Sequence, residues 1–151
     1  MTALLVNADD FGLHTSVNSA IANCIHFGSV NSVSVIANGS SPDFDLLRKF
    51  KAKNIFIGIH LTWVGEPWLT DKVFIKDWKA LAQKIIWGGK KFQTKLLNEG
   101  DAQINKLTEQ KLQLSHIDSH QHVHHFPVVW QVAKELQTKY AIERMRVAAV
   151  K

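Results

Sequence analysis

LLVNADDFG, at residues 4–12, opens the chain with the pattern that the rest of the sequence repeats. Residues 4–6 form a short continuous apolar run, which is typical of a strand covered on both faces. The run stops at residues 7–12, a polar segment that carries two adjacent aspartates and ends in glycine. In α/β proteins such segments follow buried strands, and they carry the side chains that bind ligands.

Strand-like and helix-like patterns alternate along the rest of the chain, which predicts βαβ units and a parallel sheet. Residues 61–100 are looser and predict a long excursion with one or two short helices. Asp101 is the expected N-cap of the helix that follows it. The predicted strands are 4–6, 31–36, 55–60, 116–120 and 144–150, and the clearest helices are 17–28, 46–50 and 127–136.

The composition is that of one globular domain in 151 residues, with 46% hydrophobic and 21% charged residues. The net charge of +5 comes from the lysines between positions 72 and 111. These lysines are mostly scattered singly, and the chain has three arginines, so a solvated face is a better interpretation than a nucleic-acid site. No signal peptide and no membrane span is expected, and the predicted location is the cytoplasm.

Residues 116–124, HIDSHQHVH, hold four histidines and one aspartate at alternating positions. A strand directs alternate side chains to one face, so this spacing predicts four imidazoles and the Asp118 carboxylate on the same side. Imidazole and carboxylate are the usual ligands of divalent metals. The alternative is a soluble histidine-rich turn without a catalytic role.

Potential metal ligands come from three separate segments, each at the predicted carboxyl end of a strand: Asp9 and Asp10, His60, and His120. Because these ends meet at one edge of a parallel sheet, we expect the side chains to converge. Taken singly, each has another interpretation. The paired aspartates also suit a helix N-terminus, and His60 also suits a partly buried core position.

Two imidazoles and one carboxylate leave coordination positions open, as in catalytic metal sites. Zinc, magnesium, cobalt and manganese all suit these ligand types. A divalent cation of this kind activates water, and a nearby aspartate then removes the proton. Asp118 is expected to orient a ligand imidazole through its second nitrogen.

Three motifs, NADDFG at 7–12, GIHLT at 58–62 and HIDSHQHVH at 116–124, resemble those of the YdjC-like carbohydrate deacetylases, which include chitooligosaccharide deacetylases. The similarity extends from about Leu4 to Arg146. It implies an α/β fold, a parallel-strand distorted (β/α) barrel that is incomplete, with about five strands. Residues 1–151 would be a single domain, the N-terminal portion of that barrel.

The same resemblance implies a metal-dependent hydrolase. Its substrates would be N-acetylated amino sugars of the chitooligosaccharide type, deacetylated by metal-activated water. Magnesium or zinc would bind to Asp10, His60 and His120, with Asp9 as the catalytic base. The residues expected to support the site or line the substrate groove are Asp118, His122, His124 and Trp63, with Trp68 a further candidate for sugar contact.

Members of the family usually continue beyond this length and carry a later histidine element that could supply a general acid. The chain is therefore expected to lack the C-terminal part of the barrel and to form a homo-oligomer that covers the open sides. The alternative function is a truncated, catalytically silent relative that binds metal or carbohydrate and acts through assembly. A nuclease is less favoured, because the sequence lacks phosphate-cradling loops.

Overall fold

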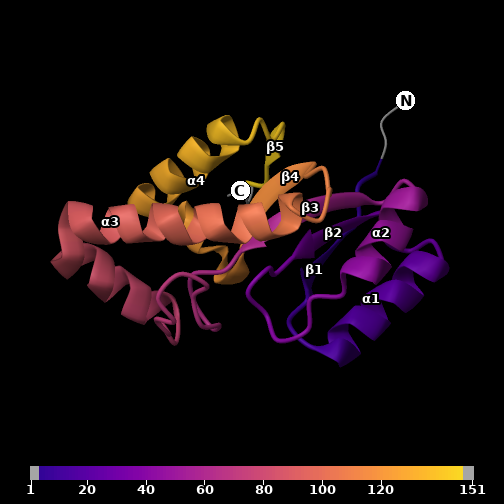
Figure 1. The fold of residues 1–151 in the computed structure, drawn as a ribbon, viewed down its shortest axis with the longest axis horizontal. Helices are drawn as coiled ribbons and strands as arrows, with labels where there is room; N and C mark the ends of the chain where they lie inside the picture. Colours follow the sequence, from indigo (N-terminus) through magenta and orange to yellow (C-terminus); the bar gives the residue numbers. More distant parts are fainter. Residues whose placement is uncertain (1–3, 148–151) are drawn as a thin grey trace.

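The computed structural model describes residues 4–147, which form a parallel five-stranded sheet in the order β1-β2-β3-β4-β5, with helices packed on it (Figure 1). The elements are β1 (Asn7–Phe11), α1 (Thr15–His26), β2 (Ser32–Val35), α2 (Phe44–Ala52), β3 (Phe56–Leu61), α3 (Trp78–Thr108), β4 (His116–Ser119), the 3-10 helix η1 (His120–His125), α4 (Pro127–Lys139) and β5 (Arg144–Met145). The predicted α/β fold with five parallel strands is confirmed.

The sheet is strongly curled, and the evidence is a side chain at one edge that contacts the opposite edge. Arg146 directly follows β5, and its guanidinium lies 2.7 Å from Asp9 Oδ1 on β1. In a flat sheet these two strands would be about 19 Å apart, since neighbouring strands are spaced by about 4.8 Å. The five strands therefore follow part of a barrel wall, with a concave inner face.

The two faces of the sheet differ in polarity. Valines and isoleucines of β2, β3 and β4 are buried on the convex face among the helices. The register places Val33 beside Ile57 and Ile59 beside Ile117 on that face. The alternate positions, including Ser32, Ser34, His116 and Asp118, point inward and carry hydrogen-bonding groups. The concave face is therefore equipped for polar chemistry.

The first strand begins later than predicted. Leu4, Leu5 and Val6 are exposed, and the strand that pairs with β2 is Asn7–Phe11. A continuous apolar run indicates a strand buried between two apolar layers. Here the inner face is polar, so Asn7 and Asp9 belong to the strand and not to a loop after it.

The predicted excursion at 61–100 is also wrong in its second half. Residues 78–108 form α3, a 31-residue helix that bends where Gly89 has a non-helical φ of 52° (Figure 1). Its N-cap is Asp77, whose side chain accepts a hydrogen bond from the Ala80 amide. Asp101 lies inside α3 and not at a helix start. Its carboxylate accepts a hydrogen bond of 2.7 Å from the Tyr140 hydroxyl.

No helix within residues 4–147 is long and apolar enough to cross a membrane. The fifth strand is described over Arg144–Met145, and the remainder of the predicted 144–150 strand lies partly outside the described residues. The helix predicted from Pro127 is confirmed as α4, with Pro127 in its first turn.

Leu136 of α4 is fully buried and packs above Gly100 of α3, where a β-carbon would lie 2.5 Å from its methyl carbon. We expect Leu136→Ala to lower the free energy of unfolding by about 2–5 kcal/mol, because it leaves a cavity between the two helices. Glu135→Ala, at an exposed neighbouring position, should change it by less than about 0.5 kcal/mol. Urea denaturation followed by circular dichroism measures both, and equal midpoints would contradict this packing.

Candidate metal and catalytic site

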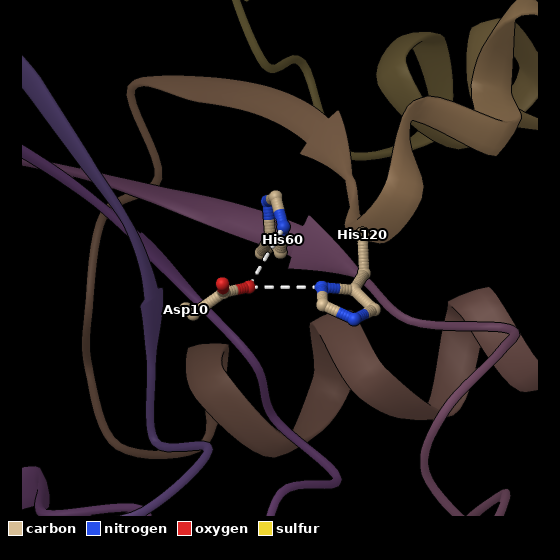
Figure 2. Close-up of side chains that lie close together, drawn as sticks. All are labelled: Asp10, His60 and His120. Carbon is tan, nitrogen blue, oxygen red and sulfur yellow. Dashed lines mark hydrogen bonds and ion pairs between the residues drawn. The ribbon is translucent and has the colours of Figure 1, made fainter. Parts of the chain in front are cut away.

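Asp10, His60 and His120 converge at the carboxyl ends of the strands, as Figure 2 shows. Asp10 Oδ1 lies 2.9 Å from His120 Nδ1 and 3.3 Å from His60 Nε2. One ligand atom from each residue lies within 4.8 Å of the others, which is a spacing that a single cation can bridge. The predicted convergence of three distant segments is therefore present in the structure.

A β-bulge brings Asp10 into the site. The pairing of β1 with β2 shifts register between Ala8 and Phe11, and Asp10 has a left-handed φ of 68°. Consecutive residues of a regular strand point to opposite faces. The bulge interrupts that alternation, and Asp9 and Asp10 each place a carboxylate oxygen within 4.8 Å of a His60 ring nitrogen. Each carboxylate then has its own set of partners.

His60 is oriented by Asp118 of the neighbouring strand. Its Nδ1 lies 2.6 Å from Asp118 Oδ1, and both side chains are buried. This leaves Nε2 directed toward Asp10. The arrangement is that of a metal-binding histidine held by a carboxylate, and it is the role predicted for Asp118.

The charges at this pair favour a protonated imidazole when no cation is bound. Burial alone would lower the pKa of His60, but hydrogen bonds to Asp10 and Asp118 outweigh it and raise the pKa to about 9. Hydrogen bonds from His120 and His60 hold the pKa of Asp10 far below its ordinary value. Burial works against ionisation of Asp118, yet hydrogen bonds from His60 and Ser34 keep its pKa low. Two ionised carboxylates, Asp10 and Asp118, thus flank His60 and favour a positive charge on or beside it.

Asp9 is held by Arg146 and Asn7. Arg146 donates to Oδ1 at 2.7 Å and to Oδ2 at 2.8 Å, and Asn7 Nδ2 donates to Oδ1 at 2.7 Å. A carboxylate has about four acceptor positions, so these three hydrogen bonds leave one free on Oδ2. Asp9 is therefore fixed in orientation and still able to accept one proton or hydrogen bond.

The inner face continues below the site as a buried polar network. Ser34 Oγ donates to Asp118 Oδ2 at 2.9 Å and lies 3.0 Å from His116 Nε2. The His116 imidazole occupies the space above Gly58, where a β-carbon would lie 2.3 Å from the ring. Burial lowers the pKa of His116, so that this imidazole stays neutral. It is a structural support and not one of the converging ligands.

The histidine-rich segment does not continue as a strand beyond Ser119. Gln121 and His122 have left-handed φ values of 53°, and the chain turns into η1. The prediction of four imidazoles on one face is therefore wrong. His124 is buried and is not one of the three converging side chains. Its Nδ1 lies 2.6 Å from Ser119 Oγ, and its Nε2 lies 3.0 Å from the Arg146 carbonyl. His122 is exposed on the turn, with its ring 6.1 Å from that of His125.

The predicted sugar contact by Trp63 is also wrong for this conformation. Trp63 and Trp68 are fully buried, so neither ring presents a surface to a ligand. The Trp63 indole donates to the Leu96 carbonyl at 2.9 Å, and the Trp68 indole donates to the Trp63 carbonyl at 3.0 Å. These two rings anchor the loop after β3 against α3.

Two residues near the site were missed in the sequence. Arg146 lies inside the predicted strand 144–150, but the observed β5 ends at Met145, so Arg146 stands at a strand end that the sequence did not indicate. Glu66 lies in the loop after β3. Burial raises the pKa of its half-buried carboxyl, and the neighbouring His120 opposes that rise. Nothing in the spacing of the sequence indicates Glu66, because its place depends on how the loop folds back.

Within the described part of the chain, two sets of side chains are close enough to hold a cation, and their chemistry distinguishes them. In the second set, Asp9, His60 and Asp118, both carboxylates already accept hydrogen bonds from the Arg146 guanidinium. A fixed positive charge there opposes a second cation. Among residues 4–147, no lysine or arginine forms an ion pair with Asp10, and His60 has the orienting carboxylate that metal ligands commonly have. This donor set therefore fits a divalent cation better.

Comparisons with known proteins agree with these motifs. The chain matches the family described as YdjC-like protein over residues 3–151. It is 30% identical to a carbohydrate deacetylase of Halalkalibacterium halodurans over 145 residues, and 26% identical to one of Vibrio parahaemolyticus over 142 residues. These alignments cover 91% and 92% of this chain.

The solved structures include a protein of Enterococcus faecalis V583, provisionally named as a cellobiose-phosphate cleavage protein, with a TM-score of 0.79 and 23% identity. That match covers 97% of this chain and 59% of the other, and it supports the fold. The chain spans 60% and 57% of the two deacetylases named above.

Burial, together with the charge of His125, lowers the pKa of His124 to about 4 from its ordinary 6.5. Between pH 4 and pH 6.5 the folded chain therefore binds fewer protons at His124 than the unfolded chain does. The contribution of neutral His124 to the free energy of unfolding is complete above pH 6.5 and declines toward pH 4. We expect the free energy of unfolding to fall by about 2 kcal/mol on this account between pH 7 and pH 5. His124→Gln should reduce that slope in urea denaturation, and an unchanged slope would contradict the assignment.

Proposed function

This chain belongs to the YdjC-like family, and from that premise we propose that it hydrolyses the acetyl group from N-acetylated amino sugars. The observation that carries the proposal is the convergence of Asp10, His60 and His120 beside the separately held carboxylate of Asp9. One group of side chains can bind a cation while another accepts a proton, and metal-assisted hydrolysis of an amide uses both.

The cofactor that we propose is a divalent metal ion, magnesium or zinc, bound by Asp10, His60 and His120. A bound cation of this type lowers the pKa of water and polarises a carbonyl. The chain's own contribution is to fix the ligands. Asp118 directs His60 Nε2 toward Asp10, and the β-bulge at Asp10 brings the carboxylate between the two imidazoles.

Asp9 is the proposed general base. Its remaining acceptor position on Oδ2 is available to take the proton of the attacking water. Arg146 and Asn7 keep the carboxylate from rotating, and Arg146 also donates to Asp118 Oδ2 at 3.3 Å. The guanidinium therefore links the proposed base to the carboxylate that orients a proposed ligand.

The proposed substrates are N-acetylated oligosaccharides of the chitooligosaccharide type. Support for this class comes from the relatives, which are named carbohydrate deacetylases. We also propose that the protein assembles as a homo-oligomer, since β1 and β5 are the edge strands of the described sheet and each pairs on one side only. Sedimentation velocity should give a mass above that of one chain, and a monomer at micromolar concentration would contradict this part.

We expect Asp9→Asn to keep metal affinity and to lower the rate of acetate release by about 10²–10⁴-fold, because the variant lacks the base. His120→Ala should lose both metal binding and turnover, because it removes a ligand. Calorimetric titration with Zn²⁺ or Mg²⁺ measures the first property. Acetate release from chitooligosaccharides at saturating metal measures the second.

The matched control is His122→Ala, which removes an exposed imidazole two residues from His120. It should leave both properties within about threefold of the unaltered chain. Unchanged metal affinity in His120→Ala would show that the ligand assignment is wrong. Metal binding without any acetate release by the unaltered chain would instead favour the catalytically silent relative.

A further inference from the structure

Trp78 is an exposed aromatic side chain that is hydrogen-bonded to the segment following His120. It is the first residue of α3, directly after the loop that leaves the carboxyl end of β3. Its backbone amide lies 3.3 Å from Oε1 of Gln121, which accepts the hydrogen bond. Because Gln121 immediately follows His120, Trp78 is joined to the segment that supplies one of the proposed ligands.

The indole is supported from beneath and remains available to a ligand. Its ring centroid lies 6.4 Å from that of Phe126, which closes η1, and 47% of the residue is exposed. The Asp77 N-cap and the hydrogen bond to Gln121 fix the backbone on which the ring is carried. A binding surface held in this way loses little conformational entropy when a ligand is bound.

Lys79 does not block the ring. Its ammonium lies 5.5 Å from the indole centroid, and such an exposed cation–π contact contributes only about 0.5–1 kcal/mol. Lysine has a long, flexible side chain that can move aside at this small cost. Once displaced, its ammonium can donate hydrogen bonds to hydroxyl groups beside the ring.

The other tryptophans differ from Trp78 in burial or in position. Trp63 and Trp68 are fully buried. Trp130 stacks at 6.5 Å on the buried His124. Trp87 is 87% exposed near the bend of α3, nine positions along the chain from Trp78. Among the five tryptophans of the chain, all within the described residues, Trp78 alone combines exposure with a hydrogen bond to the η1 segment.

We propose that Trp78 is a stacking platform for a pyranose ring of the oligosaccharide, beside the sugar whose acetyl group lies at the metal site. This inference rests on the proposed deacetylase function and names a residue that binds its substrate. A pyranose presents an apolar face of C–H groups and a rim of hydroxyls. An exposed indole matches the face, and the Lys79 ammonium matches the rim.

Binding should be measured in the metal-loaded Asp9→Asn protein, which would hold the sugar without consuming it. Calorimetric titration with tri-N-acetylchitotriose should give a dissociation constant about tenfold higher when Trp78→Ala is combined with Asp9→Asn than for Asp9→Asn alone. That is the loss expected for one aromatic contact. Trp78→Tyr keeps an aromatic face and should stay within about threefold. Trp87→Ala, on the same helix, is the matched control and should bind normally.

Tryptophan fluorescence gives a second measurement, since sugar stacking on Trp78 should change the emission and Trp78→Tyr should abolish that change. Unaltered affinity in Trp78→Ala, an equal loss in Trp87→Ala, or no sugar binding by the parent protein would overturn the proposal. The proposal would also be overturned if Trp78→Ala changed the sedimenting mass and kept normal sugar affinity, because the ring would then belong to a contact between subunits. Binding that depends on Trp78, without acetate release by the unaltered chain, would overturn the proposed function and leave this inference standing.

Discussion

The hydrogen bond between His60 Nδ1 and Asp118 Oδ1, 2.6 Å long, is the interaction on which the arrangement of the site depends. It joins β3 to β4 at their carboxyl ends and determines which imidazole nitrogen faces Asp10. Both groups are buried, so each would carry a large desolvation cost without the other. The remaining oxygen of Asp118 accepts from Ser34 and Arg146, which extends the same constraint to β2 and to the end of β5.

The polarity of the concave face explains why this constraint can exist. A sheet covered by helices on both sides would bury apolar side chains at every position. Here the helices contact the convex face, where Val33, Ile57 and Ile117 are buried. The inner positions are then free to carry serine, histidine and aspartate, provided that they satisfy one another. Curling brings these groups within reach across strands that are not neighbours, as the contact of Arg146 with Asp9 shows.

The convergence of Asp10, His60 and His120 could be predicted from the order of strands and helices and the rule that ligands gather at strand ends. The β-bulge that brings Asp10 into place could not. The pairing of Arg146 with Asp9 could not, since it depends on the curvature of the whole sheet. The burial of Trp63 could not be predicted from the sequence either, because an aromatic residue after a strand suits both a ligand groove and a buried core. The loose pattern of residues 61–100 predicted an excursion with short helices, whereas one non-helical residue, Gly89, bends α3 without ending it.

The absence of a side chain at Gly58 couples two positions of the chain. The His116 ring fills the volume that any β-carbon at position 58 would occupy. The two residues lie side by side in the register of β3 and β4 but are separated by 57 intervening positions in the sequence. A side chain at position 58 would therefore require the buried His116 ring to move or to be replaced by something smaller. A larger residue at position 58 should accordingly be tolerated better once position 116 has become small.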